Sequence, residues 1–328
     1  MIAFGPVPSR RLGRSLGINN IPPKVCTYSC VYCQLGRTIK MQIERDTFYK
    51  PRDIFSDVQD KVEKAERDGE AIDYLTFVPD GEPTLDANLA QEIDLLKPLG
   101  IKVAIITNSS LIWRDDVRDA LLKADWVSLK VDSVIDKIWR RVDRPHGTLD
   151  LEAILDGALE FAQAFEGELT TETMLVAGVN DGVENLQAVG DFLFELSPDT
   201  AYLSIPTRPP AEKWVKSPKE EVINRAYQIV SQRMVADRKH PPVEYLIGYE
   251  GNAFAFTGDI EDDLLSITSV HPMREDAVEE FLARARSKDQ ENATWTTVRR
   301  LVEQDRLVET EYGDHRFYLR RLKEPHRS

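Results

Sequence analysis

The sequence of 328 residues has only three cysteines, no acidic residue among its first forty positions and no long apolar run. Three cysteines cannot form the paired framework of a disulfide-rich secreted domain. Without an apolar stretch of about 20 residues, the chain has no candidate for a membrane-spanning helix. Its N-terminus also lacks a basic segment followed by an apolar one. These absences predict a soluble, cytoplasmic protein with no membrane partner.

The missing acids make the charge uneven along the chain. The net charge is −14, whereas residues 1–40 carry six Lys or Arg and no Asp or Glu. Such an arm can be a solvated surface, or it can attract anions to a nearby site. We favour an anionic substrate, and the arginines that we expect to bind it are Arg10, Arg11, Arg14 and Arg208.

The three cysteines lie within eight residues, in the segment Cys26-Thr27-Tyr28-Ser29-Cys30-Val31-Tyr32-Cys33. Iron–sulfur clusters and structural zinc sites usually take four protein ligands. A C-x3-C-x2-C loop with no further cysteine therefore predicts a metal site with three thiolates and one ligand that is not protein. Zinc with a histidine as its fourth ligand is the alternative, but none of the five histidines lies near the loop in sequence.

Short β-rich runs alternate with helical ones as far as about residue 237. This alternation predicts βα units around a parallel sheet. Polar residues follow the predicted strands, and in a βα barrel the carboxyl ends of the strands build the active site. The predicted strands are Ser15–Asn19, Ile72–Val78, Val103–Ile106, Trp126–Asp132, Leu169–Val176 and Tyr202–Pro206.

After about residue 255 the pattern changes. Helices near Ala277–Arg286 and from Thr294 to Val302 precede a predicted hairpin at 307–319, an order similar to that of a winged helix. We therefore expect two domains, a barrel with a basic arm over 1–255 and a winged-helix-like module over 256–328. Such modules contact nucleic acid or dock proteins. The charge of 292–328 is balanced, which argues against a strong phosphate-binding surface.

The cysteine loop resembles the signature of the radical S-adenosylmethionine superfamily. The resemblance implies a partial (β/α)6 TIM-type barrel in which Cys26, Cys30 and Cys33 hold a [4Fe–4S] cluster. It also implies that S-adenosylmethionine binds the fourth iron and yields a 5′-deoxyadenosyl radical, which takes a hydrogen atom from the substrate. An external electron donor of the flavodoxin or ferredoxin type would then be a partner.

The resemblance extends to Asp80-Gly81-Glu82-Pro83, which stands where the superfamily has a Gly-Gly-Glu motif. It implies that Gly81 and Glu82 hold the methionine ammonium group. The resemblance further implies contacts to S-adenosylmethionine from Tyr32, Asn108, Asp132 and Val179. From the residues alone, Glu82 could instead stabilise a helix N-terminus, Asn108 and Asp132 could cap loops, and Tyr32 could belong to the core.

The arm and the segment after Cys30 look like a subgroup that includes tRNA wyosine synthase. The chain has no cysteines for the second cluster of that enzyme, which argues against the same reaction. Three interpretations follow. A tRNA- or nucleotide-modifying enzyme predicts that Arg10, Arg11 and Arg14 line the barrel mouth beside the cluster. The others are a protein-modifying or radical-activating enzyme, and an iron–sulfur sensor whose winged helix binds DNA.

Overall fold

The computed structural model describes residues 2–234, 243–248, 251–252, 254, 256, 259–287 and 294–321. The main sheet has eight strands in the order β1-β2-β5-β6-β7-β8-β9-β10. Every neighbouring pair is parallel except β1 with β2. These strands are β1 (Ala3–Ser9), β2 (Gly13–Ile18), β5 (Tyr74–Phe77), β6 (Lys102–Thr107), β7 (Trp126–Lys130), β8 (Glu168–Met174), β9 (Thr200–Ser204) and β10 (Val243–Leu246).

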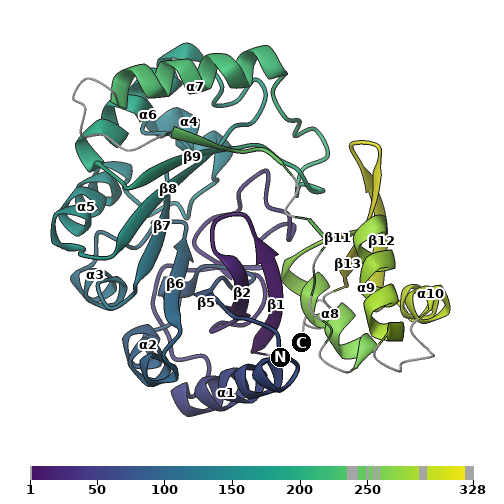
Figure 1. Ribbon diagram of the computed structural model, residues 1–328. Coiled ribbons are helices and arrows are strands. Elements are labelled where there is room, and N and C mark those ends of the chain that lie inside the picture. The colour runs from purple at the N-terminus through teal and green to yellow at the C-terminus, as the bar shows by residue number, and fades with distance from the viewer. Residues whose placement is uncertain are drawn as a thin grey trace.

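Helices cover the outer side of this curved sheet (Figure 1). The first of them starts at Pro51, a residue suited to a first helical position, and buries apolar residues at helical spacing: Ile54, Val58, Val62 and Ala65. The predicted α/β class and barrel-type sheet are therefore confirmed. The helices are α1 (Pro51–Arg67), α2 (Leu89–Leu96), α3 (Asp115–Leu121), α4 (Asp136–Val142), α5 (Leu151–Ala164), α6 (Val183–Leu196) and α7 (Glu220–Met234).

Two strands of the sheet were not among those predicted. The sequence of β1 contains two prolines and suggests an extended arm, yet it forms the edge of the sheet, where a missing N–H is tolerated. Its Phe4 lies against Gly17 of β2, so closely that a Cβ at Gly17 would be 2.0 Å from the ring. At the other edge, β10 pairs with β9.

The hairpin turn between β1 and β2 lies at the amino-terminal end of the parallel strands. Ser9 pairs with Gly13, and Ser15 pairs with Tyr74, the first residue of β5. The cysteine loop instead follows the carboxyl end of β2. The turn that carries Arg10 and Arg11 is therefore at the opposite end of the strands from the start of this loop.

The last elements form a smaller unit with a three-stranded sheet in the order β11-β13-β12. Its two predicted helices and its hairpin are present, and a further helix and a short strand precede them. The described elements are α8 (Ile260–Val270), β11 (Met273–Arg274), α9 (Glu275–Ser287), α10 (Trp295–Glu303), β12 (Leu307–Tyr312) and β13 (His315–Arg320). Residues 257–258, 288–293 and 322–328 of the predicted module lie outside the described residues.

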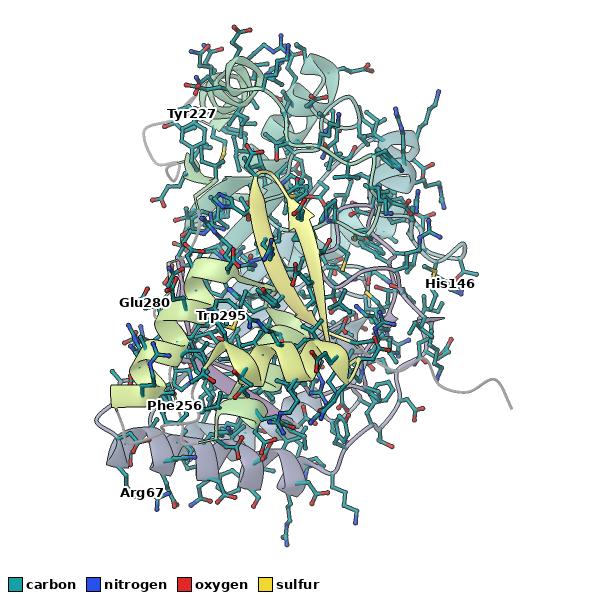
Figure 2. The ribbon with its side chains drawn as sticks, turned by 90° about the vertical axis from the view of Figure 1, so that its right-hand side faces the viewer. Arg67, His146, Tyr227, Phe256, Glu280 and Trp295 are labelled. Atoms are coloured by element: carbon teal, nitrogen blue, oxygen red, sulfur yellow. The ribbon has the colours of Figure 1, made fainter. Side chains whose placement is uncertain are left out.

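Strand β1 links the two sheets through its two faces. Ala3 packs in the core of the barrel, whereas Phe4 and Val7 belong to a second apolar cluster with Phe256 and Leu264. Figure 1 shows α8 beside β1. Figure 2, in which the right-hand side of Figure 1 faces the viewer, shows α10 and the β12–β13 hairpin in front. No helix in the described part of the chain is long and apolar enough to cross a bilayer.

Candidate functional site

A cavity of about 320 Å³, which we call the central cavity, lies inside the curved sheet. Its lining comes from the carboxyl ends of the strands, from the cysteine loop and from the β1–β2 turn. Ten of the thirteen predicted site residues line it: Arg10, Arg11, Cys26, Cys30, Tyr32, Cys33, Gly81, Glu82, Asn108 and Arg208. The other three, Arg14, Asp132 and Val179, are not part of the lining.

The cysteine loop starts at β3 (Val25–Cys26), which pairs with β4 (Lys40–Met41). None of the three cysteines forms a disulfide. Cys30 Sγ donates to Asp143 Oδ1 at 3.4 Å, and Cys26 Sγ accepts from Asn108 Nδ2 at 3.5 Å. Over the described residues, no three His, Cys, Asp or Glu side chains converge as a preformed metal site. Two of the thiols are instead engaged by neighbouring protein groups.

The thiols still suit a metal that replaces their protons. Burial raises the pKa of all three, and together with Glu82 it brings the pKa of Cys26 to about 12. Buried thiols of this kind keep their protons until a metal displaces them, because thiolate rather than thiol is the ligand. Three soft sulfur donors on one cavity wall match an iron–sulfur centre.

Gly81 lets the loop after β5 approach the cysteine loop. It has φ +155° and forms a bridge with Val25, and a Cβ on Gly81 would be 1.9 Å from the Val25 carbonyl oxygen. Lys24 adds two contacts to the same loop: its N–H donates to the Asp80 carbonyl at 2.7 Å, and Nζ lies 3.2 Å from Asp80 Oδ1. Asp80, which stands in place of a glycine, therefore fastens the start of the cysteine loop to β5.

Glu82 is held almost entirely by the protein. Its Oε1 accepts from Thr84 N at 3.0 Å and from the hydroxyls of Thr84 and Thr107 at 2.6 Å each. Its Oε2 accepts from Asn108 N at 2.7 Å. Each carboxylate oxygen has about two acceptor positions, and Oε2 accepts a single bond here, so one position at Oε2 is left for a further donor. Burial raises the pKa of Glu82, while the bonds from Thr107 and Thr84 oppose that rise.

Asn108 connects the end of β6 to the cysteine loop. Its Nδ2 donates to Thr27 Oγ1 at 2.8 Å besides approaching Cys26 Sγ. Its Oδ1 accepts from Ser110 N at 3.0 Å, and Ser110 Oγ in turn bonds Thr27 Oγ1 at 2.6 Å. The amide therefore orients Cys26 and the residue after it.

Tyr32 and Asp132 form a buried pair behind the cysteine loop. The Tyr32 hydroxyl donates to Asp132 Oδ2, and Asp132 Oδ1 accepts from Met174 N at 2.6 Å. Asp143 Oδ1 lies 3.3 Å from the same hydroxyl. Burial, together with the nearby Asp132 carboxylate, raises the pKa of Asp143 well above its ordinary value. Val179 packs with Tyr32 in a small apolar cluster. Asp132 thus fixes the Tyr32 ring, which faces the cavity.

The predicted arginines divide into two groups. Arg10, Arg11 and Arg208 line the central cavity. Arg208 Nη1 donates to Gln34 Oε1 at 2.7 Å, and Nη2 lies 2.8 Å from His271 Nε2, so it joins the cysteine loop to the end of α8. Arg14 is on the outer side, where its Nε donates to Ala71 O at 3.1 Å.

Two charged residues of the cavity were missed at the level of sequence. Lys130 of β7 and Glu172 of β8 are register partners, and Lys130 Nζ donates to Glu172 Oε1 at 2.8 Å. Asp143, which contacts Cys30, was missed as well. A Lys and a Glu inside otherwise buried strands are the signal that could have identified the first two, since unpaired charges are rarely buried.

Comparison with known proteins defines the class. Residues 20–189 match the Radical SAM superfamily. The chain therefore belongs to the radical SAM superfamily, whose enzymes use S-adenosylmethionine and an iron–sulfur cluster. Within it, the chain is 48% identical to the UPF0026 protein MJ1312 of Methanocaldococcus jannaschii over 98% of this chain and 97% of that protein. It is 37% identical to a UPF0026 protein of Helicobacter pylori over 68% and 71% of the two chains.

Solved structures agree with the fold. A radical SAM methyltransferase from Sphaerobacter thermophilus superimposes with a TM-score of 0.54 at 15% identity, over 71% of this chain and 66% of that one. TYW1 with a lysine–pyruvate adduct bound gives a TM-score of 0.52 at 15% identity, over 67% and 73%. At these identities the likeness concerns the fold alone.

Proposed function

We propose that Cys26, Cys30 and Cys33 ligate a [4Fe–4S] cluster and that the protein uses it to cleave S-adenosylmethionine. The observation that carries the proposal is that these three thiols, the only ones in the chain, line one cavity together with Gly81 and Glu82. When bound, the cluster supplies an electron that splits the cofactor and yields a 5′-deoxyadenosyl radical.

The neighbouring residues have separate tasks in this proposal. The acceptor position left on Glu82 Oε2, beside the Gly81 backbone, suits the methionine ammonium group. Asn108 orients Cys26, and Asp132 holds Tyr32 so that its ring and the Val179 cluster form the apolar side of the nucleoside site. Asp132 and Val179 therefore act behind the cavity wall, and Asn108 supports a metal ligand.

We further propose that the radical abstracts hydrogen from an anionic substrate, and that a nucleotide of tRNA is the first candidate. Arg10, Arg11 and Arg208 in the cavity lining support the anionic character. A flavodoxin or ferredoxin in the cytoplasm would donate the electron. Residues 1–255 would form the barrel domain, and 256–328 a winged-helix-like module, which the element order α8-β11-α9-α10-β12-β13 supports.

Anaerobic reconstitution with iron and sulfide, followed by reduction with dithionite and addition of S-adenosylmethionine, tests the central proposal. We expect the visible absorbance of a [4Fe–4S] cluster and release of 5′-deoxyadenosine, measured by liquid chromatography. Cys30→Ala should lose both signals. Ser29→Ala is the control, because Ser29 lies between the proposed ligands in sequence but is not itself a ligand. This variant should keep both signals.

Two results would contradict the proposal. Stoichiometric zinc in place of iron after reconstitution would favour the zinc alternative. A complete, reducible cluster that yields no 5′-deoxyadenosine would favour a sensor over an enzyme.

A further inference from the structure

The interior of the barrel contains a group of charged side chains that the cofactor site does not use. Glu172 Oε2 accepts from Arg11 Nη1 at 2.8 Å, Oε1 accepts from Lys130 Nζ at 2.8 Å, and the Ser204 hydroxyl donates to Oε1 at 2.9 Å. The side chains of Arg11, Lys130 and Glu172 are 12%, 18% and 11% exposed. All four residues line the central cavity.

Strand register and the β1–β2 turn bring this group together. Lys130 and Glu172 are Cα partners on β7 and β8, so their side chains emerge side by side on the inner face. Arg11 reaches in from the opposite end, with its guanidinium 5.6 Å from the centre of the Trp126 ring and 5.9 Å from that of Tyr202. The two aromatic rings and Glu172 therefore fix the direction of Arg11.

Glu172 holds two cations and leaves most of their donors unused. Arg11 Nη1 also donates to Ser128 Oγ at 3.2 Å, but within the described residues Arg11 Nε and Nη2 have no hydrogen-bond acceptor. In the part of the chain that the structure describes, Lys130 Nζ bonds Glu172 alone, and it lies 5.2 Å from the centre of the Tyr32 ring. Donors of a guanidinium and an ammonium thus face the cavity without acceptors from the part of the chain described.

The charges of the cavity lining also favour binding of an anion. Four cationic residues line the cavity, Arg10, Arg11, Lys130 and Arg208, against two carboxylates, Glu82 and Glu172. Both carboxylates accept hydrogen bonds from protein donors. Asp132 is near Lys130 but is directed to Tyr32 and Met174. An additional anion beside Arg11 and Lys130 would pair with cations that Glu172 holds in place and that are largely desolvated, which favours binding.

We propose that Arg11 and Lys130, held in place by Glu172, bind a compact oxyanion of the substrate, either a carboxylate or a phosphate. The inference rests on the proposed function, because it names the substrate group which that same cavity receives. Glu172 is a positioning residue in this scheme. A cavity of about 320 Å³ limits the bound part of the substrate to a small molecule or a single nucleotide.

Binding of simple anions to the reconstituted protein tests the assignment without requiring turnover. Inorganic phosphate and acetate are titrated calorimetrically at constant ionic strength, with acetamide as the neutral probe. We expect at least one of the two anions to bind and acetamide not to bind. Tighter binding of phosphate would identify a phosphate-bearing substrate, and tighter binding of acetate a carboxylate-bearing one. Absence of binding by both anions would overturn the proposal.

Variants locate the bound anion. Arg11→Met and Lys130→Met should each weaken anion binding at least tenfold. Lys130→Arg, which keeps the positive charge, should retain most of the parental affinity. Arg14→Met is the matched control, since Arg14 is on the same hairpin but outside the cavity, and it should bind like the parent protein. Unchanged affinity for the anions in both methionine variants would show that Arg11 and Lys130 have a structural role in the barrel interior and do not bind the anion.

A competition experiment distinguishes the substrate site from the cofactor site. Saturation with S-adenosylhomocysteine, which carries the same α-amino-acid carboxylate as S-adenosylmethionine, should leave phosphate or acetate binding intact. Loss of anion binding would assign the cation pair to the cofactor and overturn the proposal. Parent protein that has the cluster absorbance and releases 5′-deoxyadenosine but binds neither anion would contradict this inference alone, whereas absence of both of those signals would contradict the proposed function, so the two failures are distinguishable.

Discussion

Glu92 on α2 is a buried carboxylic acid that faces a second one. Both Glu92 and Asp86 are 0% exposed, and Asn20 Nδ2 approaches Glu92 Oε2 at 3.4 Å. Burial, together with the Asp86 carboxylate, raises the pKa of Glu92 to about 9. A protonated Glu92 can donate to Asp86, whereas an ionised one places two negative charges in the core.

Glu92→Gln should therefore remove a pH dependence of stability. The folded pKa of Glu92 is raised from 4.5 to about 9, so its contribution is complete below the lower value and is lost as the pH rises toward the upper one. The glutamine amide can donate to Asp86 at any pH. At about pH 9 we expect the variant to exceed the parent in free energy of unfolding by roughly 1–3 kcal/mol.

Urea unfolding at both ends of this pH window measures the difference. The matched control is Glu184→Gln, because Glu184 is an exposed residue of the first turn of α6. An equal pH slope in Glu92→Gln and in the parent would show that Glu92 does not carry the effect.

Asn108 provides the second prediction at the scale of a residue. Its Nδ2 contacts Cys26 Sγ and Thr27 Oγ1, so Asn108→Ala removes the group that orients one thiol. We expect iron loss to a chelator to be about 10–100-fold faster, with the thermal unfolding of the barrel little changed. Asn88→Ala, whose amide contacts Tyr49 O at 3.4 Å far from the cysteines in sequence, should lose iron at the parental rate.

At the scale of elements, the approach of β3 to the end of β5 depends on Gly81. A Cβ there would be 1.9 Å from the Val25 carbonyl oxygen, and φ +155° disfavours any other residue. Gly81→Ala should destabilise the fold by more than about 3 kcal/mol and prevent cluster assembly, because β3 carries Cys26.

Thermal unfolding and iron content after reconstitution would report both effects. Gly182→Ala is the control, since Gly182 has open space around its Cβ position and does not have a positive φ. A stable Gly81→Ala protein with full iron content would contradict the structural role of this contact.

Elements with a strong repeat were predictable from the sequence, whereas those that depend on partners were not. The spacing of Ile54, Val58 and Val62 identifies α1 because one helix buries them. In contrast, β1 contains two prolines and becomes a strand only through its pairing with β2.

The site divides in the same way. The cysteine spacing and the Gly81-Glu82 motif are local, so they could be found in the sequence. The pairing of Lys130 with Glu172 follows from the register of β7 and β8, and the inward direction of Arg11 follows from the position of the β1–β2 turn. Neither is encoded in a short stretch of chain.

At the scale of the whole molecule, the barrel and the smaller sheet should unfold together. Phe4 of β1 is 2% exposed within the cluster that includes Phe256, Leu264 and Phe281, while its strand is hydrogen-bonded to β2 of the barrel. Phe4→Ala should lower the free energy of unfolding by about 3–5 kcal/mol. Far-ultraviolet circular dichroism and tryptophan fluorescence should give one coincident transition, in the parent and in the variant.

The control replaces an exposed apolar residue of similar kind. Phe194→Ala on α6 changes a side chain that is 38% exposed and should cost much less stability. Two separate transitions in the parent protein would show that the smaller unit folds independently of β1.

The shared strand β1 also has a consequence for synthesis of the chain on the ribosome. Phe4 and Val7 are made well before the other buried members of their apolar cluster, which lie at 254–318. At about 5–20 residues per second, roughly 10–60 s of translation separate the two. During that interval this face of the nascent hairpin lacks most of the side chains that later cover it, so a cell that makes this protein must protect it with a chaperone or tolerate some aggregation.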